Sequence, residues 1–360
     1  MIAHNKPWIE GEDNAALLEV LESLRISTGE AVAALEEHIG NLFNSGSAVL
    51  CSSGTAALFL ALKALDLRPG SYIAIPTYSC RALCDAVSLA GLVPVAVDVE
   101  EDLNISAPAL ARKAKEVSLA AVIVIHNFGK RADLEAIHEL RIPFVIEDCC
   151  HSFGGKFNSG WHDSTSHICV YSFYATKILT SGQGGMVWCR NKELADRIRL
   201  FLHPDFTEGG YIPGFNFRIT DFQAAMIGSQ LNRIDVIRAR RYKIAASYFR
   251  SLPVHLQKTI SDPANKVMNY RFVMFANSEA ERESLYHYFL QRKIECSRLF
   301  QKNQLVHINL GLPPHDFKQS ENAVGLTLSI PLYPLLSDEE AAYIGACIEA
   351  MPCRQLMTGH

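Results

Sequence analysis

Lys177 is the first residue whose surroundings suggest covalent chemistry. It ends the small and apolar segment 172–177 (Ser-Phe-Tyr-Ala-Thr-Lys), and a glycine-rich turn at 182–185 (Gly-Gln-Gly-Gly) follows it. Burial lowers the pKa of a lysine, and a neutral amine is the nucleophile that condenses with an aldehyde. Considered alone, Lys177 is also compatible with an ordinary surface lysine, so the hypothesis needs support from other residues.

Asp148 follows the apolar run 144–147, and His151 comes three residues later. A carboxylate at the end of a buried strand costs free energy unless a cation meets it, and a protonated pyridine nitrogen would serve. The alternatives are a helix cap at Asp148 or a metal cluster of Cys149, Cys150 and His151. We expect no metal, because adjacent cysteines point in different directions and no second Cys/His pair has the spacing of ligands.

A third signal is the turn at Ser53, Gly54 and Thr55, which follows the apolar run 48–51 and opens a helical pattern. Such a turn leaves backbone N–H groups and the positive end of a helix dipole free for a phosphate, although it could also be a plain helix cap. One ligand accounts for all three signals. Pyridoxal-5′-phosphate (PLP) would place its phosphate at Gly54, Thr55 and Ser172, its ring nitrogen at Asp148 and its aldehyde at Lys177.

Short apolar runs rich in Val and Ile alternate with helical patterns, which predicts an α/β fold with a mostly parallel, doubly wound sheet. In such a sheet, ligands bind where the strands end, which is where the residues above are found. The predicted strands are 48–51, 72–75, 93–97, 121–126, 144–147, 168–172 and 186–189, and the helices between them are 55–65, 81–90 and 133–140.

From about residue 194 the pattern becomes helical, and a smaller α+β unit follows. We predict two domains: an N-terminal segment with a large PLP-binding domain over 1–235, and a small C-terminal domain over 236–360. The expected elements are helices at 220–231, 233–249, 278–291 and 338–351, and strands at 269–275 and 323–330.

Composition argues against several classes of protein. The formal charge is −4 over 360 residues and the Lys and Arg residues are scattered, so no nucleic-acid partner is expected. The sequence has neither the order of a signal peptide nor an apolar stretch of about 20 residues, so we expect a cytoplasmic protein without a membrane segment. The ten cysteines are spread from Cys51 to Cys353 and read as reduced core residues.

With these motifs in order, the chain resembles the DegT/StrS-type sugar aminotransferases of PLP fold type I from about residue 7 to about residue 348. The motifs that carry the resemblance are STGE at 27–30, SGTAAL at 53–58, PTY at 76–78, VDV at 97–99, HNFG at 126–129, ED at 147–148, SFYATK at 172–177, GQGG at 182–185 and GFNFRITD at 214–221.

The resemblance implies roles for individual residues. Lys177 matches the lysine that forms the Schiff base and shuttles a proton, and Asp148 matches the partner of the ring nitrogen. His151 matches a residue beside the cofactor ring and its phenolic oxygen. Ser53, Gly54, Thr55 and Ser172 match the phosphate-binding segments, and Asn216 matches a phosphate contact from the neighbouring subunit of a homodimer.

The sequence departs from the family in two places: Cys80 stands where an aromatic residue often stacks on the cofactor ring, and Val267-Met268-Asn269-Tyr270 replaces the usual His-Tyr-rich strand entry. A polarizable sulfur could still lie against the ring. The resemblance implies transfer of an amino group from an amino acid, L-glutamate by preference, to a nucleotide-linked keto-sugar through pyridoxamine phosphate. The alternatives are a PLP-dependent sugar dehydratase, whose class has histidine in place of the lysine, and a PLP-binding regulatory protein.

Overall fold

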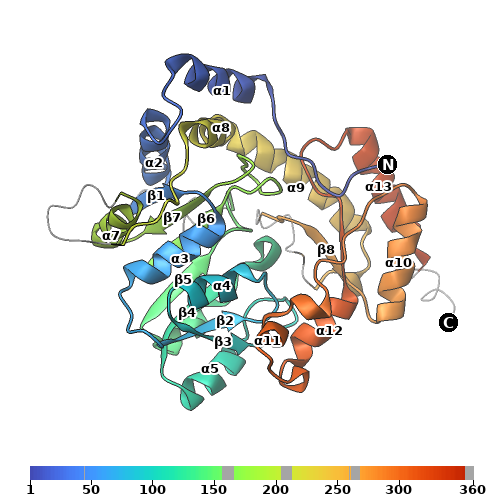
Figure 1. The fold of residues 1–360 in the computed structure, drawn as a ribbon. Coiled ribbons are helices and arrows are strands. Elements are labelled where there is room, and N and C mark those ends of the chain that lie inside the picture. The colour runs from blue at the N-terminus through green and yellow to red at the C-terminus, as the bar shows by residue number, and fades with distance from the viewer. Residues whose placement is uncertain (44, 156–165, 204–212, 259, 261–267, 353–360) are drawn as a thin grey trace.

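A computed structural model describes residues 1–43, 45–155, 166–203, 213–258, 260 and 268–352 (Figure 1). The described residues form two β-sheets, one of seven strands and one of two. Helices pack against both sheets. None of the described helices is long and apolar enough to cross a membrane.

The large sheet has the strand order β1-β7-β6-β5-β4-β2-β3. Every neighbouring pair is parallel except those that involve β7, which runs antiparallel to both β1 and β6. This confirms the predicted mostly parallel sheet, and the carboxyl ends of all the other strands therefore meet at one edge. The bounds are β1 (Ser47–Cys51), β2 (Tyr72–Pro76), β3 (Val93–Val97), β4 (Leu119–Ile125), β5 (Phe144–Asp148), β6 (Ile168–Ser172) and β7 (Gly185–Cys189).

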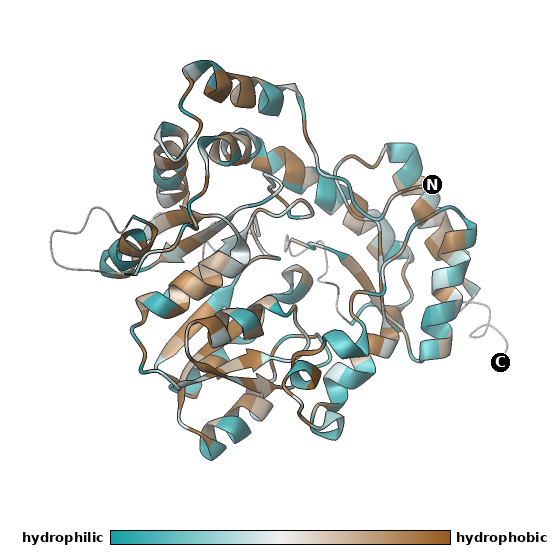
Figure 2. Cartoon of the chain, viewed as in Figure 1, coloured by the Kyte–Doolittle hydropathy of each residue, from teal (hydrophilic) through white to brown (hydrophobic). Residues whose placement is uncertain are grey.

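Alternation along the strands gives the sheet two apolar faces, and each is covered by helices (Figure 2). In β1, Val49 and Cys51 face one core while Ala48 and Leu50 face the other. The first face is covered by α3 (Gly54–Ala64), α4 (Ala82–Leu89) and α7 (Lys192–Leu202). The second face is covered by α2 (Glu30–Leu42) and α8 (Asp221–Asn232) at one end and by α5 (Ala107–Glu116) and α6 (Leu134–Glu139) at the other. Helix α1 (Gly11–Ser23) packs outside α8.

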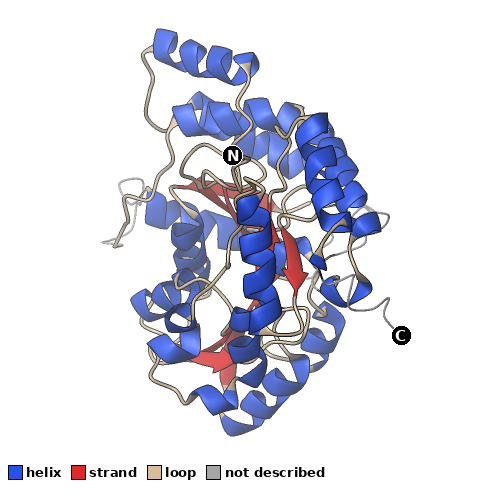
Figure 3. Cartoon of the chain, turned by 90° about the vertical axis from the view of Figure 1, so that its right-hand side faces the viewer, coloured by secondary structure: helices blue, strands red, loops and turns tan. Residues whose placement is uncertain are grey.

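The second sheet belongs to a smaller unit, whose side of the molecule faces the viewer in Figure 3. Helix α9 (Ile234–Ser251) connects the two units, because Ile234 and Ile237 lie in the core under the large sheet while Ile244 and Tyr248 lie in the small core. It thus spans the predicted boundary at 235/236. The remaining elements are β8 (Phe272–Phe275), α10 (Glu279–Gln291), α11 (Val306–Asn309), α12 (Lys318–Leu326), β9 (Thr327–Ile330), α13 (Asp338–Glu349) and the 3₁₀ turns η1 (Asn127–Gly129), η3 (Val254–Leu256), η5 (Lys302–Gln304) and η6 (Pro314–Asp316).

Two strand predictions in the small unit need correction. The predicted strand 323–330 is helical up to Leu326, where α12 ends, and only Thr327–Ile330 forms β9. A short apolar run has no period that separates a buried strand from the last turn of a helix. The predicted strand 269–275 begins only at Phe272, because the residues before it contact the turn η1 instead of a β-strand.

The contact with η1 joins the two units at the carboxyl edge of the large sheet. The N–H of Tyr270 donates to the carbonyl of Phe128 at 2.8 Å. Gly129 has φ +94°, and a Cβ at that position would lie 1.6 Å from the carbonyl oxygen of Met268. The backbone of Met268–Tyr270 can therefore approach this turn only because Gly129 has no side chain.

We predict that Gly129→Ala destabilises the protein by more than about 3 kcal/mol, since the new methyl group overlaps backbone that cannot move without breaking the contact. Gly91→Ala is the matched control, because Gly91 also has positive φ (+79°) but open space around its Cβ position. The control should lose only the roughly 1–2 kcal/mol of a left-handed residue. Denaturant unfolding at one protein concentration measures both, and equal losses would contradict this account.

Candidate active site

Asp148 is a buried carboxylate at the end of β5. It is 5% exposed, and one oxygen accepts the N–H of Cys150 at 3.0 Å. Burial, and then the charge of Asp148, raises the pKa of the neighbouring Cys150 thiol well above its usual value. Among the residues that the structure describes, no Lys, Arg or His lies within ion-pair distance of this carboxylate. A protonated ring nitrogen would supply the missing charge.

Lys177 lies just beyond β6 and points its amine at an aromatic ring from the small unit. The Nζ atom is 4.8 Å from the centroid of Tyr270, close enough for a cation–π contact. The Tyr270 hydroxyl in turn lies 3.0 Å from the Thr176 hydroxyl. Burial would raise the pKa of Tyr270, but the charges of Lys177 and Arg271 outweigh that effect and lower it.

His151 is stacked between two aromatic rings. Its ring centroid is 4.4 Å from Tyr270 and 5.6 Å from Phe128, with an angle of 15° between the planes in both pairs. Burial lowers its pKa well below the usual value, and the charges of Lys177 and Arg271 lower it further. Because Nδ1 accepts the N–H of Phe128 at 3.4 Å, the proton of the neutral ring is assigned to Nε2. His151 can therefore donate a hydrogen bond to an oxygen in the site.

The turn at Ser53, Gly54 and Thr55 lies beside the end of β6. Ser53 caps α3 by accepting the N–H of Ala56 at 3.1 Å, and Gly54 begins the helix. A Cβ on Gly54 would lie 2.9 Å from the Cβ of Ser172, so these two segments touch. Backbone N–H groups at the start of an 11-residue helix and the Ser172 hydroxyl thus face the same place, which suits a phosphate.

Cys80 lies four residues after β2 and is exposed, as expected for a residue that lines an open site. Its pKa is raised by the protein around it and by the charge of Asp148, and Lys177 partly opposes the change. The charges of Asp148 and Lys177, the two groups predicted to hold the cofactor, therefore both act on the Cys80 thiol. Cys80 lies with these two groups, but its side chain provides no aromatic ring to stack on the cofactor.

Asn216 lies on a segment that packs against helix α3. Its neighbours Phe215 and Phe217 pack against Phe59, with ring centroids at 4.8 Å and 5.8 Å. Asn216 lies between them on the opposite side of the chain and is exposed. The segment nevertheless runs beside the phosphate turn, because the N–H of Ser52 donates to the carbonyl of Phe217 at 2.7 Å.

The Cys149 and Cys150 side chains diverge, as the sequence predicts. Cys150 faces Asp148, whereas the Cys149 thiol lies with His126 and Glu147, three groups whose ligand atoms are within 4.8 Å of one another. Such a set could hold a metal ion. The His126 ring is already used on both sides, however, with Nε2 2.8 Å from Glu147 and Nδ1 accepting the N–H of Ala132 at 3.2 Å. We interpret the cluster as a structural link between the ends of β4 and β5.

Tyr270, Arg271 and Phe128 reach the site without having been assigned a role from the sequence. In the sequence, the segment 267–270 is only a departure from the family's strand entry, and Val267 lies outside the described residues. An aromatic residue next to an arginine at the start of a predicted strand is the signal that could have identified the pair.

Taken together, the described residues fit PLP. The buried Asp148 carboxylate has no cationic partner among the described residues, the helix start at Gly54 packs closely against Ser172, and the charges of Asp148 and Lys177 both act on Cys80 and Cys150. These are the partners that the ring nitrogen, the phosphate and the aldehyde of PLP require.

Comparisons with known proteins agree with this fit. Residues 7–349 match the model of the DegT/DnrJ/EryC1/StrS aminotransferase family. The chain is 28% identical to GDP-perosamine synthase of Escherichia coli O157:H7, covering 94% of this chain and 95% of that protein. It is 29% identical to the spore coat polysaccharide biosynthesis protein SpsC of Bacillus subtilis strain 168, covering 94% of each.

Among solved structures, the PMP-form of the putative sugar aminotransferase Spr1654 from Streptococcus pneumoniae superposes with a TM-score of 0.88. The match covers 99% of this chain and 98% of that one at 20% identity, so it supports the fold. The motifs, the geometry and the family match agree over nearly the whole chain. The protein therefore belongs to the DegT/DnrJ/EryC1/StrS aminotransferase family, and its cofactor is pyridoxal phosphate.

Proposed function

We propose that this sugar aminotransferase takes an amino group from L-glutamate and delivers it to the keto group of a nucleotide-linked sugar. The observation that carries the proposal is the placement of Lys177 and Asp148 at one edge of the sheet, with the start of α3 beside them. The name of the relative GDP-perosamine synthase supports a nucleotide-linked substrate.

Bound PLP supplies an aldehyde that can carry the amino group and an electron-poor ring that stabilises negative charge at the substrate carbon. The Asp148 carboxylate holds the proton on the ring nitrogen, which keeps the ring electron-poor. Lys177 Nζ would take a proton from the substrate carbon and deliver a proton to the cofactor carbon. Neutral His151 orients the ring by donating its Nε2 proton to the phenolic oxygen.

The presence of Lys177 argues against the alternative of a sugar dehydratase, whose class has histidine at that position. A regulatory protein would need none of the proton-handling groups, whereas Lys177, Asp148 and His151 are all found together here. The exposed Asn216 between two partly buried phenylalanines supports a homodimer in which each chain completes the phosphate site of the other.

Lys177→Ala should fold and bind PLP but lose transamination, because both the covalent link and the proton transfer depend on Nζ. Borohydride reduction followed by mass spectrometry should no longer fix the cofactor to the chain. Lys192→Ala is the control, since Lys192 is an exposed lysine paired with Asp196. Near-normal turnover of Lys177→Ala without an added amine would exclude the assignment.

Asp148→Asn should retain PLP but slow the proton-transfer step severely, because a neutral amide does not stabilise a protonated ring nitrogen. Stopped-flow absorbance with L-glutamate measures this step. A rate within about threefold of wild type, or about 0.7 kcal/mol on the barrier, would mean that Asp148 is only a structural cap.

The shared site predicts complementation between inactive Lys177→Ala and Asn216→Ala chains. A hybrid dimer has one site in which both residues are intact, so equal mixing should restore about one quarter of wild-type activity. Subunit exchange is followed with a size tag on one variant. If exchange occurs and no activity returns, or if the active protein is a monomer, Asn216 does not act across an interface.

A further inference from the structure

Arg271 is a half-buried cation beside the active site. Its Cζ atom lies 5.3 Å from the centroid of the Tyr270 ring, and Lys177 Nζ lies 4.8 Å from the same centroid. The two cationic groups are therefore within about 10 Å of each other. Two like charges at this separation repel each other, and an anion bound between them would offset that repulsion.

The structure gives Arg271 only neutral partners. Its Nη1 lies 3.3 Å from His4 Nδ1, and its side chain also contacts the Tyr270 ring. Burial, and then the charge of Arg271, lowers the pKa of His4 to about 4, so His4 is neutral near pH 7. Among the described residues, no carboxylate pairs with Arg271. Its charge is thus left uncompensated by this part of the chain.

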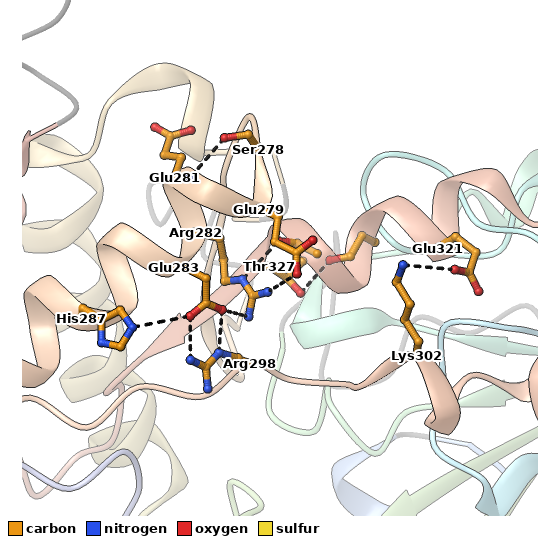
Figure 4. Close-up of polar contacts among 12 residues, drawn as sticks. Ser278, Glu279, Glu281, Arg282, Glu283, His287, Arg298, Lys302, Glu321 and Thr327 are labelled. Atoms are coloured by element: carbon orange, nitrogen blue, oxygen red, sulfur yellow. Dashed lines mark hydrogen bonds and ion pairs between the residues drawn. The ribbon is translucent and has the colours of Figure 1, made fainter.

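Other arginines of the small unit show a different arrangement (Figure 4). Arg282 contacts Glu279 and Glu283, and Arg298 makes a second ion pair with Glu283 at 2.7 Å. Arg282 and Arg298 thus have acidic partners within this unit, whereas Arg271 has none among the described residues.

A second arginine adds to the positive charge around Tyr270. Arg241 is 5% exposed, and its Nη2 donates to the backbone carbonyl of Asn269 at 3.0 Å as well as to that of Tyr270. Burial lowers its pKa to about 10. Because the Arg241 guanidinium already binds these two backbone carbonyls, Arg271 is the one of the two arginines that can bind a ligand.

We propose that Arg271 binds a carboxylate group of the amino donor. This inference rests on the proposed function, since a donor amino acid must bring its amino group to the position served by Lys177. An amino acid carries a carboxylate within a few bonds of that nitrogen, which matches a guanidinium within about 10 Å of Nζ. Guanidinium binds carboxylate through two parallel hydrogen bonds, and the contact is strongest where water is excluded.

The surroundings of Arg271 indicate how the carboxylate would enter. His4, Thr176, Tyr270 and Ser329 are among the residues that line a small cavity at Arg271, whose volume of about 10 Å³ holds no more than one water molecule. The donor carboxylate would take the place that the His4 ring now has beside Nη1. Moving the ring aside would also break its contact with the Ser329 hydroxyl, which lies 3.0 Å from His4 Nε2, so the incoming carboxylate has to replace that partner as well.

The direct test is binding of glutarate, a dicarboxylate that cannot react, to the PLP-loaded protein by isothermal titration calorimetry. Arg271→Gln should weaken binding at least about tenfold, and Arg271→Lys should weaken it less because the charge is kept. Arg292→Gln is the matched control, since Arg292 is also half-buried over a tyrosine ring but lies at the end of α10. Unchanged glutarate binding in Arg271→Gln, or no saturable binding by wild type, would overturn the proposal.

Inorganic pyrophosphate distinguishes a carboxylate site from a site for the diphosphate of a nucleotide sugar. If Arg271→Gln weakens pyrophosphate binding as much as glutarate binding, the carboxylate assignment is wrong.

The first half-reaction, in which the amino donor converts the PLP form to the pyridoxamine form, separates this inference from the proposed function. If wild type binds glutarate through Arg271 but converts no amino acid, the proposed function fails while the carboxylate site stands. If wild type reacts with L-glutamate and Arg271→Gln reacts within threefold of it, Arg271 does not hold the donor.

Discussion

The uncompensated carboxylate of Asp148 is the constraint on which the rest of the site depends. A charge at the end of a buried strand, with a backbone N–H and a thiol as its nearest partners among the described residues, is costly. In the function that we propose, a protonated ring nitrogen would offset this cost. Asp148 would then both anchor the ring and hold the proton that makes it electron-poor.

The parallel sheet brings the other groups to this point. Strands β1, β2, β5 and β6 end at one edge, so segments far apart in the sequence supply Gly54, Cys80, Asp148 and Lys177 within one site. The antiparallel β7 returns its glycine-rich start to the same edge. The small unit closes the site from the other side, because the contact of Gly129 with Met268 holds Tyr270 over Lys177 and next to His151.

Sequence patterns predicted the large sheet well because most of its strands are apolar runs buried on both faces. They also placed Asp148, Lys177 and the turn at Gly54, since strand ends can be read from such runs. Tyr270 and Arg271 were not predicted as site residues, because their position depends on the contact between η1 and the backbone at 268–270, which no local period encodes. The strand error at 323–326 has a similar cause, since burial there comes from tertiary packing of α12.

The most direct test of the central claim is the near-visible absorption of the purified, PLP-loaded wild-type protein during titration with L-glutamate. Asp148 and Lys177 hold PLP in a reactive state in our account, so the band of the PLP form should disappear as the pyridoxamine form accumulates, and 2-oxoglutarate should restore it. A protein that binds PLP but shows no change with L-glutamate or any other amino acid would contradict an aminotransferase and favour a binding role for the same fold.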